Sequence, residues 1–218
     1  MHHARWTIII PVKRLAIGKS RLRGAPADDA LVLAVALDTI DAARESDAVD
    51  RVLVVTADTT IADAVRALGA EIVADQPDAG LNPAIALGAA LAGSDRPRAA
   101  LLADVPALRS AELTDALHKA AGTCTRAYVA DHAGTGTTLL VAPAGTELGP
   151  RFGADSAAAH AASGALALDG DWPSLRLDVD TAADLAAAAR LGLGRHTAHA
   201  VRAAADAGRP ITTIDVTG

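Results

Sequence analysis

Short apolar runs rich in β-branched residues alternate with Ala- and Leu-rich stretches along most of this chain, and this alternation limits its fold more than any other feature. It favours an α/β fold, because parallel neighbouring strands need a helical crossover between them. The runs of strand type are Thr7–Val12, Arg51–Thr56, Glu71–Ala74, Ala99–Ala103, Ala127–Ala130, Thr138–Ala142 and Leu175–Val179. The stretches of helical type are Asp29–Glu45, Thr60–Leu68, Pro83–Leu91, Ser110–Ala121, Ser156–Ser163, Ala182–Leu191 and His196–Ala207.

The regular alternation ends near Asp104. Beyond it, the runs Ala127–Ala130 and Thr138–Ala142 are separated only by a glycine-rich loop, which predicts an antiparallel insertion. We therefore expect a mixed, mostly parallel sheet in one domain over residues 1–218, with a loose tail at Ile211–Gly218. Ligands of such sheets bind beyond the carboxyl ends of the strands, so the polar residues there are the candidates for function.

Composition excludes several classes of protein. The 218 residues are 51% hydrophobic and carry a net charge of −6, with only 2% aromatic residues. No apolar run approaches the roughly 20 residues of a membrane span, and the N-terminus lacks a signal peptide's apolar segment, so we expect a cytoplasmic protein without a membrane partner. The acidic balance and the scarcity of aromatic rings argue against nucleic acid. The single cysteine, Cys124, excludes an internal disulfide. A homo-oligomer stays open.

Two of the three lysines, Lys13 and Lys19, lie in one short loop behind the first apolar run. A strand that leads into a basic, glycine-containing loop and then a helix is a common way to hold polyphosphate. The alternative is an ordinary solvated basic turn. We predict that Pro11, Val12, Lys13 and Lys19 bind a nucleotide.

Three aspartates are candidate metal ligands. Asp104 follows the apolar run Ala99–Ala103, at the tip of a strand that we expect to be buried on both faces. Asp178 and Asp180 are two residues apart, so on a strand they point the same way while Val179 points to the core. A turn aspartate before proline and a helix cap at Asp180 or Thr181 are the structural alternatives, but a cap does not explain Asp178.

Two further segments open predicted helices. Asn82, before Pro83, has the residue type of an N-cap, and capping alone accounts for it, although we also place it among the nucleotide-binding candidates. Arg151–Ser156 leads into the helix that carries His160. Asp155 or Ser156 either caps the N-terminus of this helix or forms part of an anion site there. A histidine in this position is more often a satisfied core residue, so we assign His160 no catalytic role.

The loop Asp131–Thr138 separates two strands and holds two glycines and several threonines. It is longer than a tight hairpin turn requires. Its backbone amides and hydroxyls suit a phosphate, while a loose hairpin is the alternative.

Taken in order, these motifs resemble one family, the guanylyltransferases of deazaflavin coenzyme (coenzyme F-420) biosynthesis. The resemblance is to the phosphoenolpyruvate / 2-phospho-L-lactate guanylyltransferase family, in particular its actinobacterial branch, and runs from about Ile8 to about Leu193. The segments that carry it are Ile10–Leu22, Gly80–Asn82, Asp104–Pro106, Gly134–Thr137, Phe152–Ser156 and Asp178–Thr181. The chain departs from the family where Ala103 precedes Asp104, since glycine is frequent there.

The resemblance implies a nucleotide-diphospho-sugar-transferase-like (Rossmann-like) three-layer α/β fold and a Mg²⁺-dependent transfer of GMP from GTP to the phosphate of phosphoenolpyruvate. By similarity, the metal ligands are Asp104, Asp178 and Asp180. The residues that match the phosphoenolpyruvate site are Thr137, Gly153 and Ser156. Lys13 and Lys19 match the basic loop at the nucleotide phosphates, and with Asp104 they form the expected catalytic set.

Several alternatives stay open from the sequence. The acceptor could be 2-phospho-L-lactate, and a non-catalytic nucleotide sensor could use the same scaffold. A molybdopterin- or sugar-phosphate nucleotidyltransferase is a third possibility, but its first loop favours a glycine pair that Val12–Lys19 lacks. The family's product is labile, which implies a downstream transferase as a partner.

Overall fold

The computed structural model describes residues 5–13 and 29–208. Lys19, most of the first basic loop and the tail Ile211–Gly218 lie outside these residues. The strands are β1 (Trp6–Pro11), β2 (Val49–Thr56), β3 (Glu71–Ala74), β4 (Arg98–Leu101), β5 (Ala127–Ala130), β6 (Thr137–Ala142) and β7 (Leu166–Ala167). The helices are α1 (Asp29–Arg44), α2 (Thr59–Leu68), α3 (Leu81–Ala92), α4 (Ser110–Ala121), α5 (Ser156–Ala162), α6 (Pro173–Arg176), α7 (Ala182–Leu191) and α8 (Arg195–Asp206).

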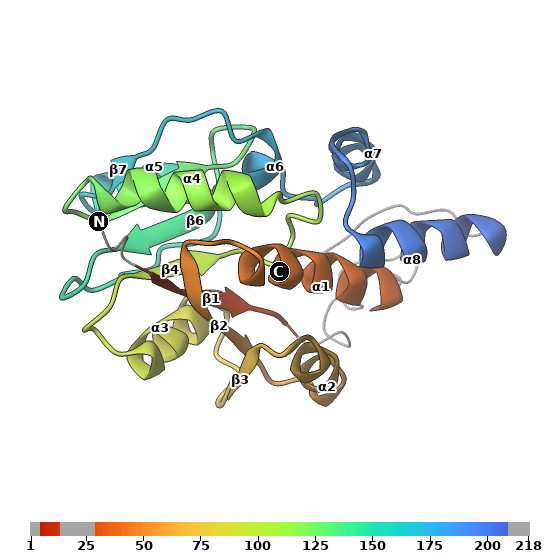
Figure 1. Ribbon diagram of the computed structural model, residues 1–218, viewed down its shortest axis with the longest axis horizontal. Helices are drawn as coiled ribbons and strands as arrows, with labels where there is room; N and C mark the ends of the chain where they lie inside the picture. Colours follow the sequence, from red (N-terminus) through yellow and green to blue (C-terminus); the bar gives the residue numbers. More distant parts are fainter. Residues whose placement is uncertain (1–4, 14–28, 209–218) are drawn as a thin grey trace.

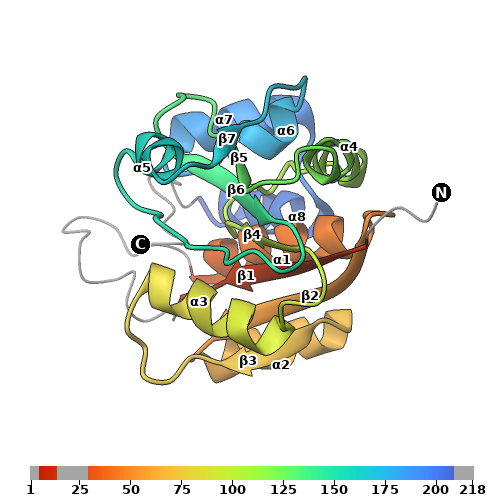
Figure 2. The same ribbon diagram turned by 90° about the vertical axis from the view of Figure 1, so that its left-hand side faces the viewer.

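The strands form one seven-stranded sheet in the order β3-β2-β1-β4-β6-β5-β7, which can be followed in Figure 1 and Figure 2 together. β1 pairs in parallel with β2 and β4, and β2 pairs in parallel with β3. Among the described strands only β6 runs the other way, antiparallel to both β4 and β5. The predicted mixed, mostly parallel sheet with an antiparallel insertion after Asp104 is therefore confirmed.

Helices cover both faces of the sheet and make three layers (Figure 2). On one face, α1, α2 and α4 pack on side chains such as Ile8, Ile10 and Leu101. On the other face, α3 and α5 pack on the alternate side chains, among them Ile9 and Leu140. Successive residues of a strand point to opposite faces, so a fully apolar strand such as β1 is buried on both sides. The four aromatic residues lie in these two cores, and aliphatic side chains fill the rest.

α3 packs unusually close to the sheet at Gly88. A Cβ atom at this position would lie 2.5 Å from Ile9 Cγ2 and 2.9 Å from Val55 Cγ2. Both of these side chains are buried in the core, so neither can move aside freely. The absence of a side chain at Gly88 thus sets the distance between helix and sheet.

One edge of the sheet collects the chain segments on which the predicted site depends. β1, β2, β3 and β4 are parallel, so their carboxyl ends lie at the same edge. Because β6 runs antiparallel to β4, its first residue, Thr137, lies at that edge too. The loop after β4, with Asp104, thereby comes beside the start of β6, and the Leu102 N–H donates to the Thr138 carbonyl at 3.0 Å.

The predicted boundaries agree with the observed ones to within one or two residues, with one exception. Leu175–Val179 was expected to be a strand and is not: the segment ends the short helix α6 and continues as irregular chain. The Glu112 carboxylate accepts hydrogen bonds from the Ser174 and Leu175 amides at 2.8 and 3.3 Å. This contact from α4 satisfies amides of the first helical turn, which a local apolar pattern cannot reveal.

In the part of the chain that the structure describes, no helix is long and apolar enough to cross a bilayer.

Candidate active site

Asp104 lies three residues beyond the end of β4 and is almost fully buried. Two backbone contacts hold the chain here. The Ala103 carbonyl accepts a hydrogen bond from Thr39 Oγ1 of α1 at 3.2 Å, and the Asp104 carbonyl accepts one from the Val179 N–H at 2.9 Å. The second bond ties the segment after β4 directly to the segment that carries the other two aspartates.

Asp178 and Asp180 flank Val179, whose side chain is buried in the core. The predicted arrangement, with the valine inward and both carboxylates on the other side, is therefore present although no strand forms. The next residue, Thr181, begins α7 with a capping box: its hydroxyl accepts from the Asp184 N–H, and the Asp184 carboxylate accepts from the Thr181 N–H. The cap thus uses Thr181 and leaves Asp180 facing the site.

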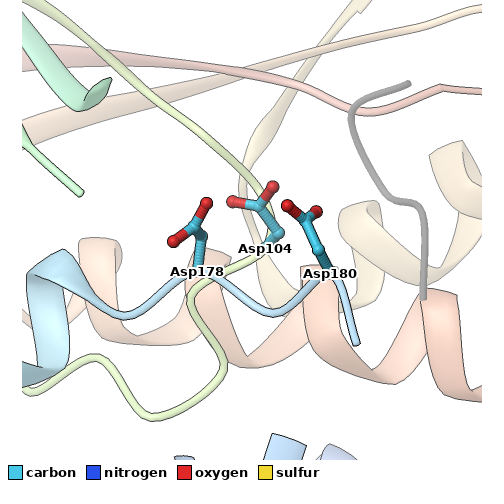
Figure 3. Close-up of side chains that lie close together, drawn as sticks. All are labelled: Asp104, Asp178 and Asp180. Atoms are coloured by element: carbon cyan, nitrogen blue, oxygen red, sulfur yellow. The ribbon is translucent and has the colours of Figure 1, made fainter. Parts of the chain in front are cut away.

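The three carboxylates converge (Figure 3). Each of Asp104, Asp178 and Asp180 offers a carboxylate oxygen, and these oxygens lie within 4.8 Å of one another. Burial raises the pKa of Asp178, and the nearby charges of Asp180 and Asp131 raise it further. His132 Nδ1 lies 3.4 Å from Asp178 Oδ1, at ion-pair distance, but this buried oxygen accepts no hydrogen bond. Such a concentration of acidic oxygen ligands suits a hard divalent cation.

The carboxylates border a pocket of about 330 Å³ that also contains the predicted acceptor residues. Thr137, Gly153 and Ser156 all line it, and they come from the start of β6, from the loop before α5 and from the first turn of α5. The structure therefore brings six predicted residues from four chain segments into one cavity. The other lining residues are Leu81, Leu102, Asp131, Thr135, Gly136, Phe152, Ala154 and Asp155.

The loop between β5 and β6 differs from the expected phosphate cradle. The Asp131 carboxylate accepts hydrogen bonds from the Thr135 N–H at 3.0 Å and the Gly136 N–H at 2.8 Å, and the Asp131 carbonyl accepts from the Gly134 N–H. These amides are therefore engaged within the loop, while phosphate binding by its threonine hydroxyls stays a prediction. Aspartate commonly closes a turn in this way, so the residue type at position 131 is a usable sequence signal for these hydrogen bonds.

Asn82 does not cap α3. The helix begins at Leu81, after Gly80, and has no side-chain cap bond. Instead Asn82 Nδ2 donates to the Phe152 carbonyl at 2.9 Å, and Asn82 Oδ1 accepts from the Phe152 N–H at 2.8 Å. The predicted cap is wrong because the side-chain amide of Asn82 is bonded to the N–H and the carbonyl of Phe152, in the loop before α5. Nucleotide binding by Asn82 stays a prediction.

Asp155 occupies the N-cap position of α5, as one of the two alternatives expected, but its side chain makes no cap bond. It has φ of 54°, in the left-handed region, which is uncommon for residues other than glycine. The chain turns sharply at this residue, and Ser156 follows it as a buried residue of the pocket wall.

Three of the described nucleotide candidates line a hollow next to this pocket. Pro11, Val12 and Lys13 line a smaller hollow together with Asp75, Asp78 and Gly80. Leu81 borders both cavities. The end of β1 is thereby placed beside the carboxylate pocket, at the same edge of the sheet.

Solved structures share this fold. A 4-diphosphocytidyl-2C-methyl-D-erythritol synthase is 17% identical, covers 86% of this chain and 99% of its own length, and superposes with a TM-score of 0.60. A nucleotidyl transferase from Methanothermobacter thermautotrophicus, also 17% identical, covers 86% of this chain and 97% of its own, with a TM-score of 0.51. At this identity the likeness establishes the nucleotidyltransferase-like α/β fold that the sequence predicted.

Relatives of much higher identity carry an enzyme name. A phosphoenolpyruvate guanylyltransferase of Salinispora arenicola is 58% identical over 197 residues, which are 88% of this chain and 92% of that protein. A protein of the same name from Geodermatophilus obscurus is 52% identical over 201 residues, with the same coverage. The family model described as "Guanylyl transferase CofC like" matches residues 6–204. The chain therefore belongs to the family of CofC-like guanylyl transferases, and is a nucleotidyltransferase.

Proposed function

We propose that this protein is a Mg²⁺-dependent guanylyltransferase that transfers GMP from GTP to the phosphate of phosphoenolpyruvate, and that pyrophosphate is the other product. The observation that carries the proposal is the shared cavity: the three converging carboxylates and the residues Thr137, Gly153 and Ser156 line the same pocket. The names of the relatives supply the substrates.

The carboxylate cluster fits a divalent cation of the Mg²⁺ type. All of its donor atoms are oxygens, which Mg²⁺ prefers to nitrogen or sulfur. The buried Oδ1 of Asp178 accepts no hydrogen bond and has only the half-exposed His132 ring at ion-pair distance, so a cation would supply the direct ligand contact that it lacks. Asp104, Asp178 and Asp180 would hold the ion. When bound, it would offset the negative charge of phosphate oxygens and of the oxygens that attack and leave.

The chemistry needs little acid–base help from the protein. A phosphomonoester oxygen of the acceptor is already anionic at pH 7, so it attacks the α-phosphorus of GTP without a general base. The new P–O bond forms in line with the bond between the α-phosphorus and the oxygen that bridges to the β-phosphate. That bond breaks, and the bridging oxygen keeps the electron pair and leaves as part of pyrophosphate. This agrees with a pocket in which none of the lining side chains among the described residues is histidine or cysteine.

The main task of the site is to bring two polyanions together. The Thr137 and Ser156 hydroxyls and the Gly153 backbone amide would seat the acceptor anion on one wall of the pocket. Lys13, at the end of β1, would neutralise the nucleotide phosphates from the neighbouring hollow. Lys19 is proposed for the same role from the sequence alone.

Two alternatives use the same pocket. The acceptor could be 2-phospho-L-lactate, which carries the same carboxylate and phosphate groups on a saturated carbon. The protein could also bind the nucleotide as a sensor without turning it over, but the three carboxylates that a sensor would not need are together. Because the product is expected to be labile, a downstream transferase that accepts it directly is a proposed partner.

The test is pyrophosphate release from GTP with Mg²⁺, measured with phosphoenolpyruvate, 2-phospho-L-lactate or 3-phosphoglycerate as the acceptor. We expect release with phosphoenolpyruvate and much slower release with the other two. Release with 2-phospho-L-lactate alone would reassign the acceptor, and GTP binding without release from any acceptor would favour the sensor.

Asp104→Asn is the matching variant. It keeps the size and one oxygen of the side chain but removes the charge, so we expect turnover to fall by at least about 100-fold while the circular dichroism spectrum is unchanged. The control is Asp63→Asn, because Asp63 lies on the exposed surface of α2 in an ion pair with Arg66. Near-normal turnover of Asp104→Asn with Mg²⁺ would show that the metal assignment is wrong.

A further inference from the structure

His160 lies behind the pocket wall, without contact with solvent, and both of its ring nitrogens are engaged. Nδ1 is 2.9 Å from Thr137 Oγ1, and Nε2 accepts a hydrogen bond from the Arg151 backbone N–H at 2.9 Å. Its ring packs edge-on against Phe152, with 5.0 Å between centroids, and Tyr128 lies on another side at 6.0 Å. The imidazole is thus held from four directions.

These contacts assign the tautomer. A backbone N–H can only donate, so Nε2 must carry its lone pair. Burial and the nearby charges of Arg126 and Arg151 lower the pKa of His160 to about 4, so the ring is neutral at pH 7. The single ring hydrogen is therefore on Nδ1, and it points at Thr137 Oγ1.

The tautomer in turn sets the direction of the Thr137 hydroxyl. Its oxygen accepts the hydrogen bond from Nδ1–H, so its own hydrogen is directed elsewhere, and Thr137 lines the pocket. A hydroxyl held in this way donates to an anionic oxygen in the pocket. With the opposite tautomer the hydroxyl would donate to the ring and present lone pairs to the anion, which would be repulsive.

The second nitrogen acts on the loop that carries Gly153. His160 fixes the Arg151 amide, and Asn82 fixes both backbone groups of the following residue, Phe152. The chain immediately before Gly153 is therefore held from two sides, by α5 and by α3.

We infer that His160 is a positioning residue of the acceptor site. Its Nδ1–H donates to the Thr137 hydroxyl and so orients that hydroxyl to donate to an anionic oxygen in the pocket. Its Nε2 accepts from the Arg151 N–H and so holds the loop that carries Gly153. The identity of that anion as the acceptor rests on the proposed function. The inference also gives a role to His160, a buried residue of α5 that is not itself among the residues lining the pocket.

Three substitutions separate the two contacts. In His160→Asn, the side-chain amide N–H takes the place of Nδ1–H and can still donate to Thr137. In His160→Gln, the longer side chain reaches the Nε2 position and can accept from Arg151, but the donor to Thr137 is lost. His160→Phe keeps the ring and removes both contacts. His199→Asn, on the exposed surface of α8, is the control.

The KM for each substrate and kcat are measured by pyrophosphate release. We expect His160→Gln and His160→Phe to raise the KM for phosphoenolpyruvate about tenfold, as for loss of one hydrogen bond to a charged group, with the KM for GTP changed less than about twofold. His160→Asn should restore the acceptor KM to within about threefold of wild type, and the control should match wild type.

A double-mutant cycle identifies the route of the effect. Thr137→Val removes the hydroxyl, so in that background His160→Gln should raise the acceptor KM by no more than about twofold further. A full tenfold effect in both backgrounds, or an equal rise in the KM values of both substrates, would overturn the inference.

A spectroscopic measurement separates this inference from the proposed function. The ¹⁵N shifts of the His160 ring, assigned by their absence in His160→Phe, should show the neutral Nδ1–H tautomer from pH 6 to pH 8. This result does not require turnover. The Nε2–H tautomer, or a titration near the ordinary histidine pKa of about 6.5, would overturn the inference even in an active enzyme. A wild-type protein that releases no pyrophosphate but has the expected tautomer would contradict the proposed function alone.

Discussion

Asp178 combines two properties expected of a functional carboxylate: its ionised form lowers the stability of the folded protein, and its side chain lines the pocket. Burial and the neighbouring negative charges raise its pKa, so the folded state holds the proton more tightly than the unfolded state does. Stability from such a group is full at low pH and is lost as the pH rises through the folded-state pKa. At pH 7 the ionised Asp178 therefore destabilises the metal-free protein.

We predict that Asp178→Asn stabilises the metal-free protein while it abolishes turnover. The gain should be about 1 kcal/mol, or a rise in Tm of about 2–4 °C for a chain of this size. Calorimetry at pH 7 with a chelator present measures it, and the gain should shrink as the pH is lowered toward 3.8. A lower Tm for the variant would mean that the ion pair with His132 outweighs burial and repulsion.

For His160 we predict the opposite dependence of folding stability on pH. Its pKa is lowered to about 4, from an ordinary value of 6.5, so between these values the unfolded state binds more protons than the folded state. Its contribution to stability is complete above pH 6.5 and is lost progressively down to pH 4. The loss should amount to roughly 2–3 kcal/mol, with Arg126 and Arg151 as the charges that oppose protonation.

Urea unfolding from pH 4 to pH 7, compared between wild type and His160→Phe, isolates this contribution because the other groups titrate in both proteins. The difference in unfolding free energy between the two should grow with pH over this interval. A difference that stays constant would show that His160 is not buried in its neutral form.

At the scale of elements, the closeness of α3 to the sheet depends on Gly88. A methyl group there would meet Ile9 and Val55 inside van der Waals distance, and overpacking of this kind costs about 1–3 kcal/mol. Alanine gains up to about 1 kcal/mol in helix propensity, so we predict a net loss of about 1–2 kcal/mol for Gly88→Ala. Its m-value should be unchanged in urea unfolding.

Gly122→Ala is the matched control, since Gly122 has φ of −80° and its added Cβ would come no closer than 3.4 Å to another atom. This variant should remain within about 0.5 kcal/mol of wild type. Equal stabilities for the two variants would contradict the idea that Gly88 sets the distance between α3 and the sheet.

At the scale of the whole molecule, the carboxylate cluster joins segments that are far apart in the chain, after β4 and before α7. A cation that binds only the folded state raises the free energy of unfolding of the whole domain. With Mg²⁺ at 100 times its Kd, the stabilisation is about 2.7 kcal/mol, which corresponds to a rise in Tm of about 5–10 °C.

The measurement is thermal unfolding with MgCl₂ against NaCl of equal ionic strength. Asp104→Asn should lose most of the shift in Tm, while Asp63→Asn should keep it. An equal shift in wild type and Asp104→Asn would indicate binding elsewhere on this acidic protein.

Much of the architecture could be predicted because it depends on patterns of neighbouring residues. Alternating apolar strands and Ala/Leu-rich helices indicate an α/β sheet, and a missing crossover helix before β6 indicates the antiparallel insertion. Asp104, placed after an apolar strand, and the Asp178–Asp180 pair were recognisable for the same reason. Residues at strand ends of such a sheet share one edge, so their proximity follows from the topology.

Only the tertiary structure decided the contacts between segments remote in the chain. Glu112 accepts from amides of α6 where a strand was predicted to begin, Asn82 holds Phe152 instead of capping α3, and Asp131 engages amides of its own loop. His160 and Thr137 become partners because α5 packs on β5 beside the start of β6. The chain by itself determined the order of elements and the positions of the candidate ligands. The folded structure determined which polar groups satisfy one another, because that depends on packing across the sheet that no local pattern contains.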